Sequence, residues 1–185
     1  MKMTPQEYDS VAARARLLVS REAIEQALDR MAAEITNALA GKDPLVLCVM
    51  TGALIVVGRL LPRLGFQLRL DYLHPTRYRN TTSGGDLAWL RRPSEAVRGE
   101  HVLVLDDILD EGVTLEAAVR ACREDGAASV LSAVLVVKDR PRSGDFSVDI
   151  LGVRVPDLYV YGCGLDYKGY FRNADGIYAV AAEDV

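Results

Sequence analysis

The sequence HVLVLDDILDEGVT, at residues 101–114, decides the class of fold. Its apolar run 101–106 predicts a buried strand, and Thr114 is expected to cap a helix over residues 115–126 that Gly126 closes. A strand, a glycine-containing turn and a helix in this order commonly form an anion site from backbone N–H groups. The segment nevertheless holds four carboxylates, those of Asp106, Asp107, Asp110 and Glu111.

Buried strands alternate with helices on both sides of this segment. Ser20 precedes a helical pattern over 21–40 that Gly41 ends, and residues 53–63 form a second helix that ends near Gly65. Apolar runs predict strands at 44–50, 68–72, 101–106 and 129–139, with shorter β-like pieces at 148–153, 158–162 and 177–181. The alternation predicts a parallel α/β sheet with right-handed crossovers.

Three turns follow the carboxyl ends of predicted strands, at residues 50–53, 106–114 and 138–142. Open parallel sheets bind ligands at these ends, so the three turns are expected to face one site. The long polar segment 74–100 leaves the same edge of the sheet. Connections of this length are usually functional or disordered, and two interpretations stay open: a mobile lid over the site and a disordered surface loop.

The composition is that of one ordinary globular domain. Of the 185 residues, 50% are apolar and 26% are charged, and the net charge is −4. This charge argues against nucleic-acid or membrane binding, so a phosphate ligand needs local geometry and a metal ion. Cys48, Cys122 and Cys163 form no CxxC pattern, which argues against a disulfide framework or zinc site. The N-terminus has no apolar leader region and no apolar run could span a membrane, so we expect a cytoplasmic protein.

The acidic turn has three interpretations. Carboxylates before a helix complement its dipole, which does not explain Asp106 and Asp107 at the end of an apolar strand. A phospho-receiver pocket also uses an Asp pair, but that pair opens its domain, whereas only 79 residues (185 − 106) follow Asp106 here. In the third interpretation, the N–H groups of 110–114 and the Thr114 hydroxyl hold a phosphate, while Asp106 and Asp107 face ribose hydroxyls. With Mg²⁺ to balance the charge, the ligand is a 5-phosphorylated ribose that carries a second phosphate group.

The residues VLVLDDILDEGVT (102–114) resemble the phosphoribosyl-pyrophosphate motif of type I phosphoribosyltransferases. That motif runs as four apolar residues, two acids, two apolar residues, Asp, any residue, Gly, any residue and Thr, and this sequence meets every fixed position. Three further segments resemble those of hypoxanthine-guanine phosphoribosyltransferases: MTGA (50–53), VVKDRPRS (136–143) and PDLYVYGCGLDYKGYFRN (156–173). The resemblance covers roughly residues 45–180.

The resemblance implies the type I phosphoribosyltransferase fold in one domain over residues 1–185. Its parallel sheet core, flanked by helices, would take about 20–140 and 175–181. A small β-containing hood would come from the N-terminal residues and about 140–175, and a mobile lid from about 74–88.

The family's roles in base recognition and chemistry carry over to matching positions. Lys138 would donate to purine O6, Tyr159 would stack on the base, and the backbone of Val160 would bind the ring edge. Asp110 would be the acid/base group near purine N7 and would stabilise the positive charge that builds on the ribose. Without the motif, Lys138 would be interpreted as a surface lysine and Tyr159 as a half-buried strand aromatic.

The family's phosphate and metal ligands carry over in the same way. Phosphoribosyl pyrophosphate would be bound by Asp106, Asp107, Asp110, Glu111, Gly112, Val113 and Thr114, and its pyrophosphate by Thr51, Gly52 and Arg172. Asp106 and Asp107 would bind Mg²⁺, and Asp166, which also borders the purine, would bind a second ion. Arg77 and Tyr78 would belong to the lid. Family members often have a cis peptide bond in the 50–53 loop, and the sequence does not determine whether Met50–Thr51 adopts it.

Three positions depart from the family pattern. Glu111 stands where Ser or Thr is common, so its side chain is expected to point away and leave only its N–H to the 5-phosphate. Arg77 stands where a Ser usually precedes the lid tyrosine and is able to add a pyrophosphate contact. Thr51 replaces a basic residue of the pyrophosphate loop.

The implied activity is magnesium-dependent purine salvage, in which hypoxanthine or guanine and phosphoribosyl pyrophosphate give IMP or GMP and pyrophosphate. Two alternatives stay open: a phosphoribosyltransferase for xanthine or a pyrimidine, and a regulator that keeps the fold without catalysis. Lys138 favours a 6-oxopurine over adenine, and Asp110 with the net charge of −4 argues against the regulator. A homodimer or homotetramer is also implied, for which apolar faces on the helices at 21–40 and 53–63 are suited.

Overall fold

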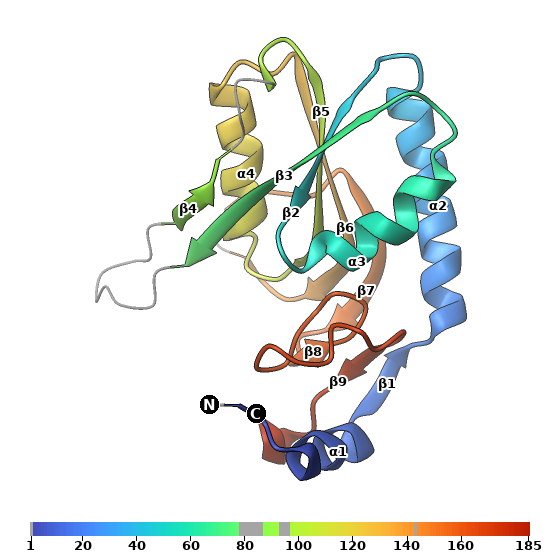
Figure 1. The fold of residues 1–185 in the computed structure, drawn as a ribbon, viewed down its shortest axis with the longest axis vertical. Coiled ribbons are helices and arrows are strands. Elements are labelled where there is room, and N and C mark those ends of the chain that lie inside the picture. Colours follow the sequence, from blue (N-terminus) through green and yellow to red (C-terminus); the bar gives the residue numbers. More distant parts are fainter. Residues whose placement is uncertain (1, 78–86, 93–96, 143) are drawn as a thin grey trace.

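The structure, a computed structural model, describes residues 2–77, 87–92, 97–142 and 144–185, which form two sheets (Figure 1). The larger sheet has six strands in the order β4-β3-β2-β5-β6-β7, and the smaller has three in the order β1-β9-β8. The strands are β1 (Arg16–Val19), β2 (Leu45–Val49), β3 (Arg69–Arg77), β4 (Leu87–Arg91), β5 (His101–Leu109), β6 (Ser129–Asp139), β7 (Ile150–Pro156), β8 (Val160–Tyr161) and β9 (Ile177–Ala179). The predicted class, a parallel sheet core flanked by helices with a small additional sheet, is confirmed.

Side chains cap the N-termini of the first two of the four described α-helices. The α-helices are α1 (Pro5–Arg14), α2 (Arg21–Leu39), α3 (Ala53–Leu60) and α4 (Val113–Glu124), with 3₁₀ helices at Leu61–Arg63 and Ala182–Asp184. The Ser20 hydroxyl accepts a hydrogen bond from the Ala23 N–H at 3.3 Å, and Gly41 follows α2 in the left-handed conformation. These are the start and stop signals that the sequence predicts for this helix.

The chain changes direction across the larger sheet between β2 and β5. β2 continues through α3 to β3 on one side, whereas β5 continues through α4 to β6 on the other, and these strands pair in parallel. Because right-handed crossovers that run in opposite directions use opposite faces, α2 and α3 lie on one face and α4 on the other (Figure 1). The adjacent carboxyl ends of β2 and β5 form the topological switch point at which α/β sheets bind ligands.

The central strands are apolar because helices cover both faces of the sheet. All five residues of β2 are buried, and so is the stretch 102–107 of β5. α2 contributes a buried stripe at helical spacing: Ile24, Leu28, Met31 and Ile35. Across 21–40, all of which the structure describes, no large apolar side chain is exposed, so the apolar face expected there for an oligomer interface is wrong.

The segment after residue 72 differs from the prediction. The sequence predicts a strand that ends at residue 72 and a loop over 74–100, but β3 continues to Arg77 and pairs antiparallel with β4. This hairpin lies at the edge of the sheet, where strands do not need a continuous apolar run. The central part of the predicted lid, including Tyr78, lies outside the described residues.

α4 begins earlier than the sequence predicts. Thr114 is expected as the N-cap, but Gly112 takes that position and the helix starts at Val113. Gly112 has a φ of 90°, which glycine adopts without strain, so the chain turns into the helix sooner. Thr114 is thereby part of the first helical turn and not its cap.

The smaller sheet joins the two ends of the chain. β1 pairs antiparallel with β9, which also pairs with β8, and α1 lies beside both chain ends at the foot of this sheet (Figure 1). A second apolar core forms here, in which Tyr8 stacks on Phe171 with ring centroids 4.0 Å apart. Among the described helices, none is both long enough and apolar enough to cross a membrane.

Candidate functional site

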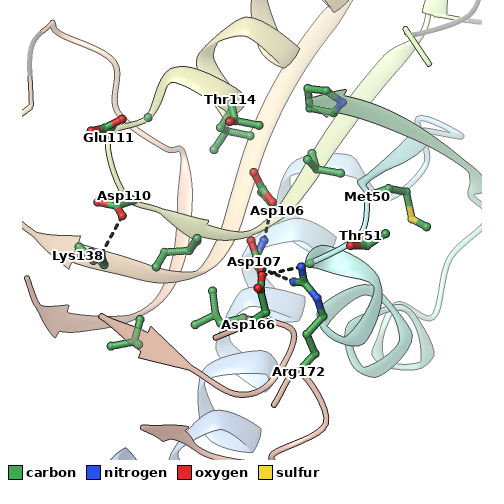
Figure 2. Close-up of a pocket in the computed structure, with 18 of the residues that line it drawn as sticks. Met50, Thr51, Asp106, Asp107, Asp110, Glu111, Thr114, Lys138, Asp166 and Arg172 are labelled. Atoms are coloured by element: carbon green, nitrogen blue, oxygen red, sulfur yellow. Dashed lines mark hydrogen bonds and ion pairs between the residues drawn. The ribbon is translucent and has the colours of Figure 1, made fainter. Parts of the chain in front are cut away.

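A cavity of about 500 Å³ opens at the carboxyl ends of β2, β5 and β6 (Figure 2). Its walls come from the turn after β2, residues 74–76 of β3, the turn after β5, the end of β6 and the segment 159–172. The predicted site residues that line it are Thr51, Gly52, Asp106, Asp107, Asp110, Glu111, Gly112, Thr114, Lys138, Tyr159, Val160, Asp166 and Arg172. The three predicted strand-end turns therefore meet at one cavity.

Asp106 and Asp107 are buried at the end of β5, with 6% and 9% of their surfaces exposed. The Asp107 N–H donates to Asp106 Oδ1 at 2.9 Å. Burial raises the pKa of Asp106 well above its usual value, and the charge of Asp107 raises it further. Burial raises the pKa of Asp107 as well, against the lowering effect of Arg172. The two carboxyl groups can be ionised at the same time only if hydroxyl donors or a cation lie beside them.

An Asp106→Asn variant is expected to be more stable than the wild type at pH 7, on the order of 1 kcal/mol, when Mg²⁺ and phosphate ligands are left out. A raised pKa means that the folded chain binds more protons than the unfolded chain above the usual value of 3.8, so wild-type stability falls as pH rises through this window. Urea unfolding from acid to neutral pH measures this slope, which the variant flattens. Asp9→Asn, an exposed change on α1, is the control. If Asp106→Asn kept the wild-type slope, the raised pKa of Asp106 would not be the cause of the pH dependence.

The turn after Asp107 leads into the N-terminus of α4. The first N–H groups of a helix have no acceptor within the helix itself. Gly112 and Thr114 line the cavity beside these donors, which is the arrangement of a helix N-terminal anion site. Glu111 is exposed at the turn, and Val113 is the first residue of the helix.

Asp110 lies between two cations. Lys138 Nζ donates to its Oδ2 at 2.8 Å, and Arg140 Nη1 donates to its Oδ1 at 2.7 Å. Lys138 is itself only 7% exposed, at the end of β6. Burial acts to raise the pKa of Asp110, but the hydrogen bonds from Lys138 and Arg140 outweigh it and hold the pKa below its usual value. Asp110 is therefore an ionised and oriented carboxylate at neutral pH.

Arg172 connects the acidic pair with the segment around Asp166. Its Nη2 lies 2.6 Å from Asp166 Oδ1 (Figure 2). Its Nη1 donates to the Gly164 carbonyl at 2.5 Å. The same guanidinium approaches Asp107 Oδ2 at 4.0 Å. A cation is thus present where the turn after β2 and the end of β5 meet.

The turn after β2 packs directly against Asp107. A Cβ atom added to Gly52 would lie 1.9 Å from Asp107 Oδ2, so only glycine permits this approach. The Met50–Thr51 peptide bond in the same turn is cis, which the sequence left open. The Thr51 side chain is exposed at the cavity.

Tyr159 and Val160 form the part of the wall at the start of β8. Val160 is buried, whereas Tyr159 is 40% exposed and its ring lies 5.4 Å from that of Tyr167. A partly exposed aromatic ring that borders a cavity suits stacking on a flat ligand.

No sequence pattern singled out the two arginines that follow Lys138. Arg140 contacts Asp110, and Arg142 donates to the carbonyls of Asp110 at 2.7 Å and Leu109 at 3.1 Å. Their position in the predicted turn 138–142 was the available signal. Arg77 is the last residue of β3, and its place in the lid and its contact with pyrophosphate stay predictions.

The donor set at the cavity fits Mg²⁺ that is bound together with a phosphate ligand. Among the described residues, no three His, Cys, Asp or Glu side chains are grouped closely enough to hold a metal ion. Asp106 and Asp107 supply two hard oxygen donors, and Mg²⁺ is commonly bound by one or two carboxylates with phosphates and water as the other ligands. A metal held by the protein alone does not fit these residues.

A buried acidic pair, a helix N-terminus and an oriented Lys–Asp pair meet at the switch point of a parallel sheet, which is the architecture of an α/β protein for phosphorylated ligands. The family model of the phosphoribosyl transferase domain matches residues 18–166. The chain belongs to the phosphoribosyltransferase family, and the resemblance of residues 102–114 to its motif is confirmed.

Relatives in this family are named for purine substrates. The chain is 32% identical over 159 residues to a hypoxanthine-guanine phosphoribosyltransferase of Bacillus subtilis, with 85% of this chain and 88% of the relative covered. It is 33% identical over 159 residues to a hypoxanthine-guanine-xanthine phosphoribosyltransferase of Tritrichomonas foetus, with 85% of this chain and 87% of the relative covered. Its fold matches a hypoxanthine phosphoribosyltransferase structure from Staphylococcus aureus with a TM-score of 0.86, 22% identity and 98% of both chains covered.

Proposed function

We propose that this phosphoribosyltransferase acts in purine salvage. It transfers the 5-phosphoribosyl group of phosphoribosyl pyrophosphate to N9 of hypoxanthine or guanine and gives IMP or GMP and pyrophosphate. The observation that carries the proposal is the Lys138–Asp110 pair, 2.8 Å apart, in the cavity that also contains the buried acids Asp106 and Asp107. The names of relatives at 32% and 33% identity support the same substrates.

In this proposal, the turn after β5 binds the phosphoribosyl group. The N–H groups of 110–114 and the Thr114 hydroxyl bind the 5-phosphate. Asp106 and Asp107 accept hydrogen bonds from ribose hydroxyls and ligate Mg²⁺, so that the buried pair is ionised despite its raised pKa values. Bound Mg²⁺ supplies positive charge that stabilises pyrophosphate as a leaving group.

The leaving pyrophosphate is bound on the other side of the acidic pair. The backbone N–H groups of Thr51 and Gly52 donate hydrogen bonds to the pyrophosphate, and Arg172 adds a positive charge beside it. Asp166, which lies 2.6 Å from Arg172, is the residue that would hold a second Mg²⁺.

The base lies between Tyr159 and the end of β6. Tyr159 stacks on its face, the Val160 backbone bonds its edge, and Lys138 donates to O6. An ammonium group has three donors and no acceptor, so it can contact Asp110 and a carbonyl oxygen together but cannot accept a hydrogen bond from the amino group of adenine. A 6-oxopurine is therefore the expected base.

The transfer forms one bond and breaks one. Purine N9 attacks C1′ of the ribose, the bond from C1′ to pyrophosphate breaks with its electron pair, and the N7 proton passes to Asp110. Since the pKa of Asp110 is lowered, the carboxylate is a weak base, and it acts through its position beside N7 and through its negative charge near the developing positive ribose.

The same proposal covers the architecture of the enzyme. One domain over residues 1–185 uses the smaller sheet and the segment between β7 and β9 as a hood, and about 74–88 as a lid that excludes water from the reacting sugar. This division differs from the predicted one at two strands: β7, within the predicted hood 140–175, pairs with β6 in the larger sheet, and β9, within the predicted core segment 175–181, pairs with β1 and β8 in the smaller sheet. A homodimer or homotetramer is favoured by exposed apolar side chains, which are Leu54 and Ile55 on α3 and Leu70 and Tyr72 on β3.

A panel of bases tests the function. Purified protein receives phosphoribosyl pyrophosphate, Mg²⁺ and one of hypoxanthine, guanine, xanthine, adenine or a pyrimidine, and nucleotide is quantified by chromatography. We expect IMP and GMP to form at least about 10²-fold faster than AMP, because Lys138 offers adenine no acceptor. Chelation of Mg²⁺ is expected to abolish the reaction. XMP as the main product would favour the xanthine alternative, and no nucleotide from any base would favour the regulator.

A further inference from the structure

Arg140 is a charged residue beside the cavity that the roles above do not use. It extends from the turn after β6, and its Nη1 lies 2.7 Å from Asp110 Oδ1 and 3.6 Å from Asp157 Oδ1. The guanidinium therefore lies between two carboxylates, one in the turn after β5 and one between β7 and β8. Arg140 does not itself line the cavity, but it contacts Asp110, which does.

The two oxygens of Asp110 are held by different cations. Lys138 occupies Oδ2 and Arg140 occupies Oδ1. The torsion that rotates a carboxylate plane is soft, so one hydrogen bond would leave the plane free to turn, whereas two bonds to different oxygens fix it. Each oxygen keeps a further lone pair that can accept a proton.

Arg140 is itself held in place by its surroundings. Its backbone N–H donates to the Lys138 carbonyl at 3.0 Å, and Asp157 attracts its guanidinium. Arg142 donates both to that Lys138 carbonyl, at 2.5 Å, and to the Asp110 carbonyl, at 2.7 Å. The turn after β6 is thus fastened to the turn after β5, which sets the distance between Arg140 and Asp110.

We propose that Arg140 is a positioning residue for Asp110: together with Lys138 it fixes the carboxylate plane so that a free lone pair faces the N7 edge of the base, while Asp157 restrains the guanidinium. This inference rests on the proposed function, because it assigns Arg140 a part in the transfer of the N7 proton.

Loss of Arg140 is also expected to change the pH at which Asp110 titrates. The charged groups around Asp110 are Lys138 and Arg140 from the end of β6, Asp157 from the connection after β7, and the neighbouring Glu111. The hydrogen bond from Arg140 lowers the pKa of Asp110, so its removal raises that pKa while Lys138 continues to lower it. The ionised form accepts the proton, and the acidic limb of the rate therefore moves to higher pH.

The test compares Arg140→Ala and Arg140→Lys with Arg154→Ala. Arg154 is the matched control because it forms an exposed pair with Asp139, at 3.3 Å, on the neighbouring strand. One measurement is the single-turnover rate of IMP formation from about pH 3 to 9, a range that includes the acidic limb set by Asp110, with the enzyme saturated with phosphoribosyl pyrophosphate and Mg²⁺. The second is the ¹³C NMR titration midpoint of the Asp110 carboxylate, assigned by its disappearance in Asp110→Asn.

Arg140→Ala is expected to slow the single-turnover rate about tenfold at neutral pH, and to move the acidic limb and the NMR midpoint upward together. Arg140→Lys restores the midpoint more fully than the rate, because it keeps the charge but not the planar fork. Arg154→Ala behaves as wild type. The proposal is overturned if Arg140→Ala keeps both the wild-type rate and the wild-type midpoint, or if Arg154→Ala matches Arg140→Ala in both.

Failure of the proposed function can be told apart from failure of the positioning role of Arg140. If the wild type forms no nucleotide with any base, the proposed function fails. The NMR midpoint alone then tests whether Arg140 controls the Asp110 carboxylate. A midpoint that moves in Arg140→Ala then supports control of Asp110 by Arg140, and an unchanged midpoint overturns it.

Discussion

An Asp110→Asn variant is expected to form nucleotide about 10²- to 10⁴-fold more slowly than the wild type, with nearly unchanged affinity for phosphoribosyl pyrophosphate. The amide oxygen can still accept from Lys138 or Arg140, which contact the carboxylate at 2.8 and 2.7 Å, so the local packing survives. The amide cannot accept the N7 proton, and it places no negative charge near the ribose. Single-turnover kinetics measure the loss, and calorimetry measures the affinity.

Asp139→Asn is the matched control for this change. Asp139 ends the same strand as Lys138 and also pairs with an arginine, Arg154, but in an exposed position away from the cavity. Its rate is expected to stay within about twofold of the wild type, as for surface changes in general. A normal rate in Asp110→Asn would mean that another group accepts the proton.

A Gly52→Ala variant is expected to lose about 10²-fold or more in kcat/KM for phosphoribosyl pyrophosphate. The new methyl group would lie 1.9 Å from Asp107 Oδ2 and 2.5 Å from Asp107 Cγ, which is closer than real atoms approach. Asp107 is only 9% exposed and has little room to move, so the turn after β2 must shift instead. This shift separates the groups that bind pyrophosphate from those that bind ribose and Mg²⁺. Steady-state kinetics over a range of Mg²⁺ concentrations measure the effect.

Gly58→Ala separates this effect from a general effect on α3. Gly58 lies in the same helix, and a Cβ atom there would have no other atom within 4 Å. Its kinetics are expected to match the wild type, and its stability to rise by about 0.5–1 kcal/mol because alanine is the better helix former. Equal losses of activity in both variants would assign the effect to the helix rather than to the contact with Asp107.

Local patterns predicted most of the larger sheet. The apolar run 129–139 is the strand β6 with the same bounds, and the helix between Ser20 and Gly41 is α2. In both cases the signal lies in consecutive residues: an uninterrupted apolar run is typical of a strand that is buried on two faces, and Ser20 and Gly41 are typical capping residues. The motif over 102–114 predicted the family because its acids, glycine and threonine all lie in one continuous stretch of sequence, so their spacing can be recognised without the fold.

The elements that differed from the prediction depend on contacts outside their own segment. β3 continues beyond residue 72 because β4 pairs with it, and the polar sequence there shows no strand pattern. The start of α4 at Val113 is a local exception, because it follows from the left-handed conformation of the adjacent Gly112, whereas the sequence predicts Thr114 as the cap. α1 with its capping box lies against the C-terminal residues, and its apolar side packs on Phe171, which is far away in the sequence.

By itself, the sequence determined the family, the class of sheet, and which turns meet at its carboxyl edge, because parallel strands end at one edge of a sheet. The tertiary structure decided which charges pair there. Asp110 lies between Lys138 and Arg140, which are 28 and 30 residues away, and Asp107 lies within reach of Arg172. Such pairs depend on distances between segments that the whole fold sets, and no local pattern of residues encodes those distances.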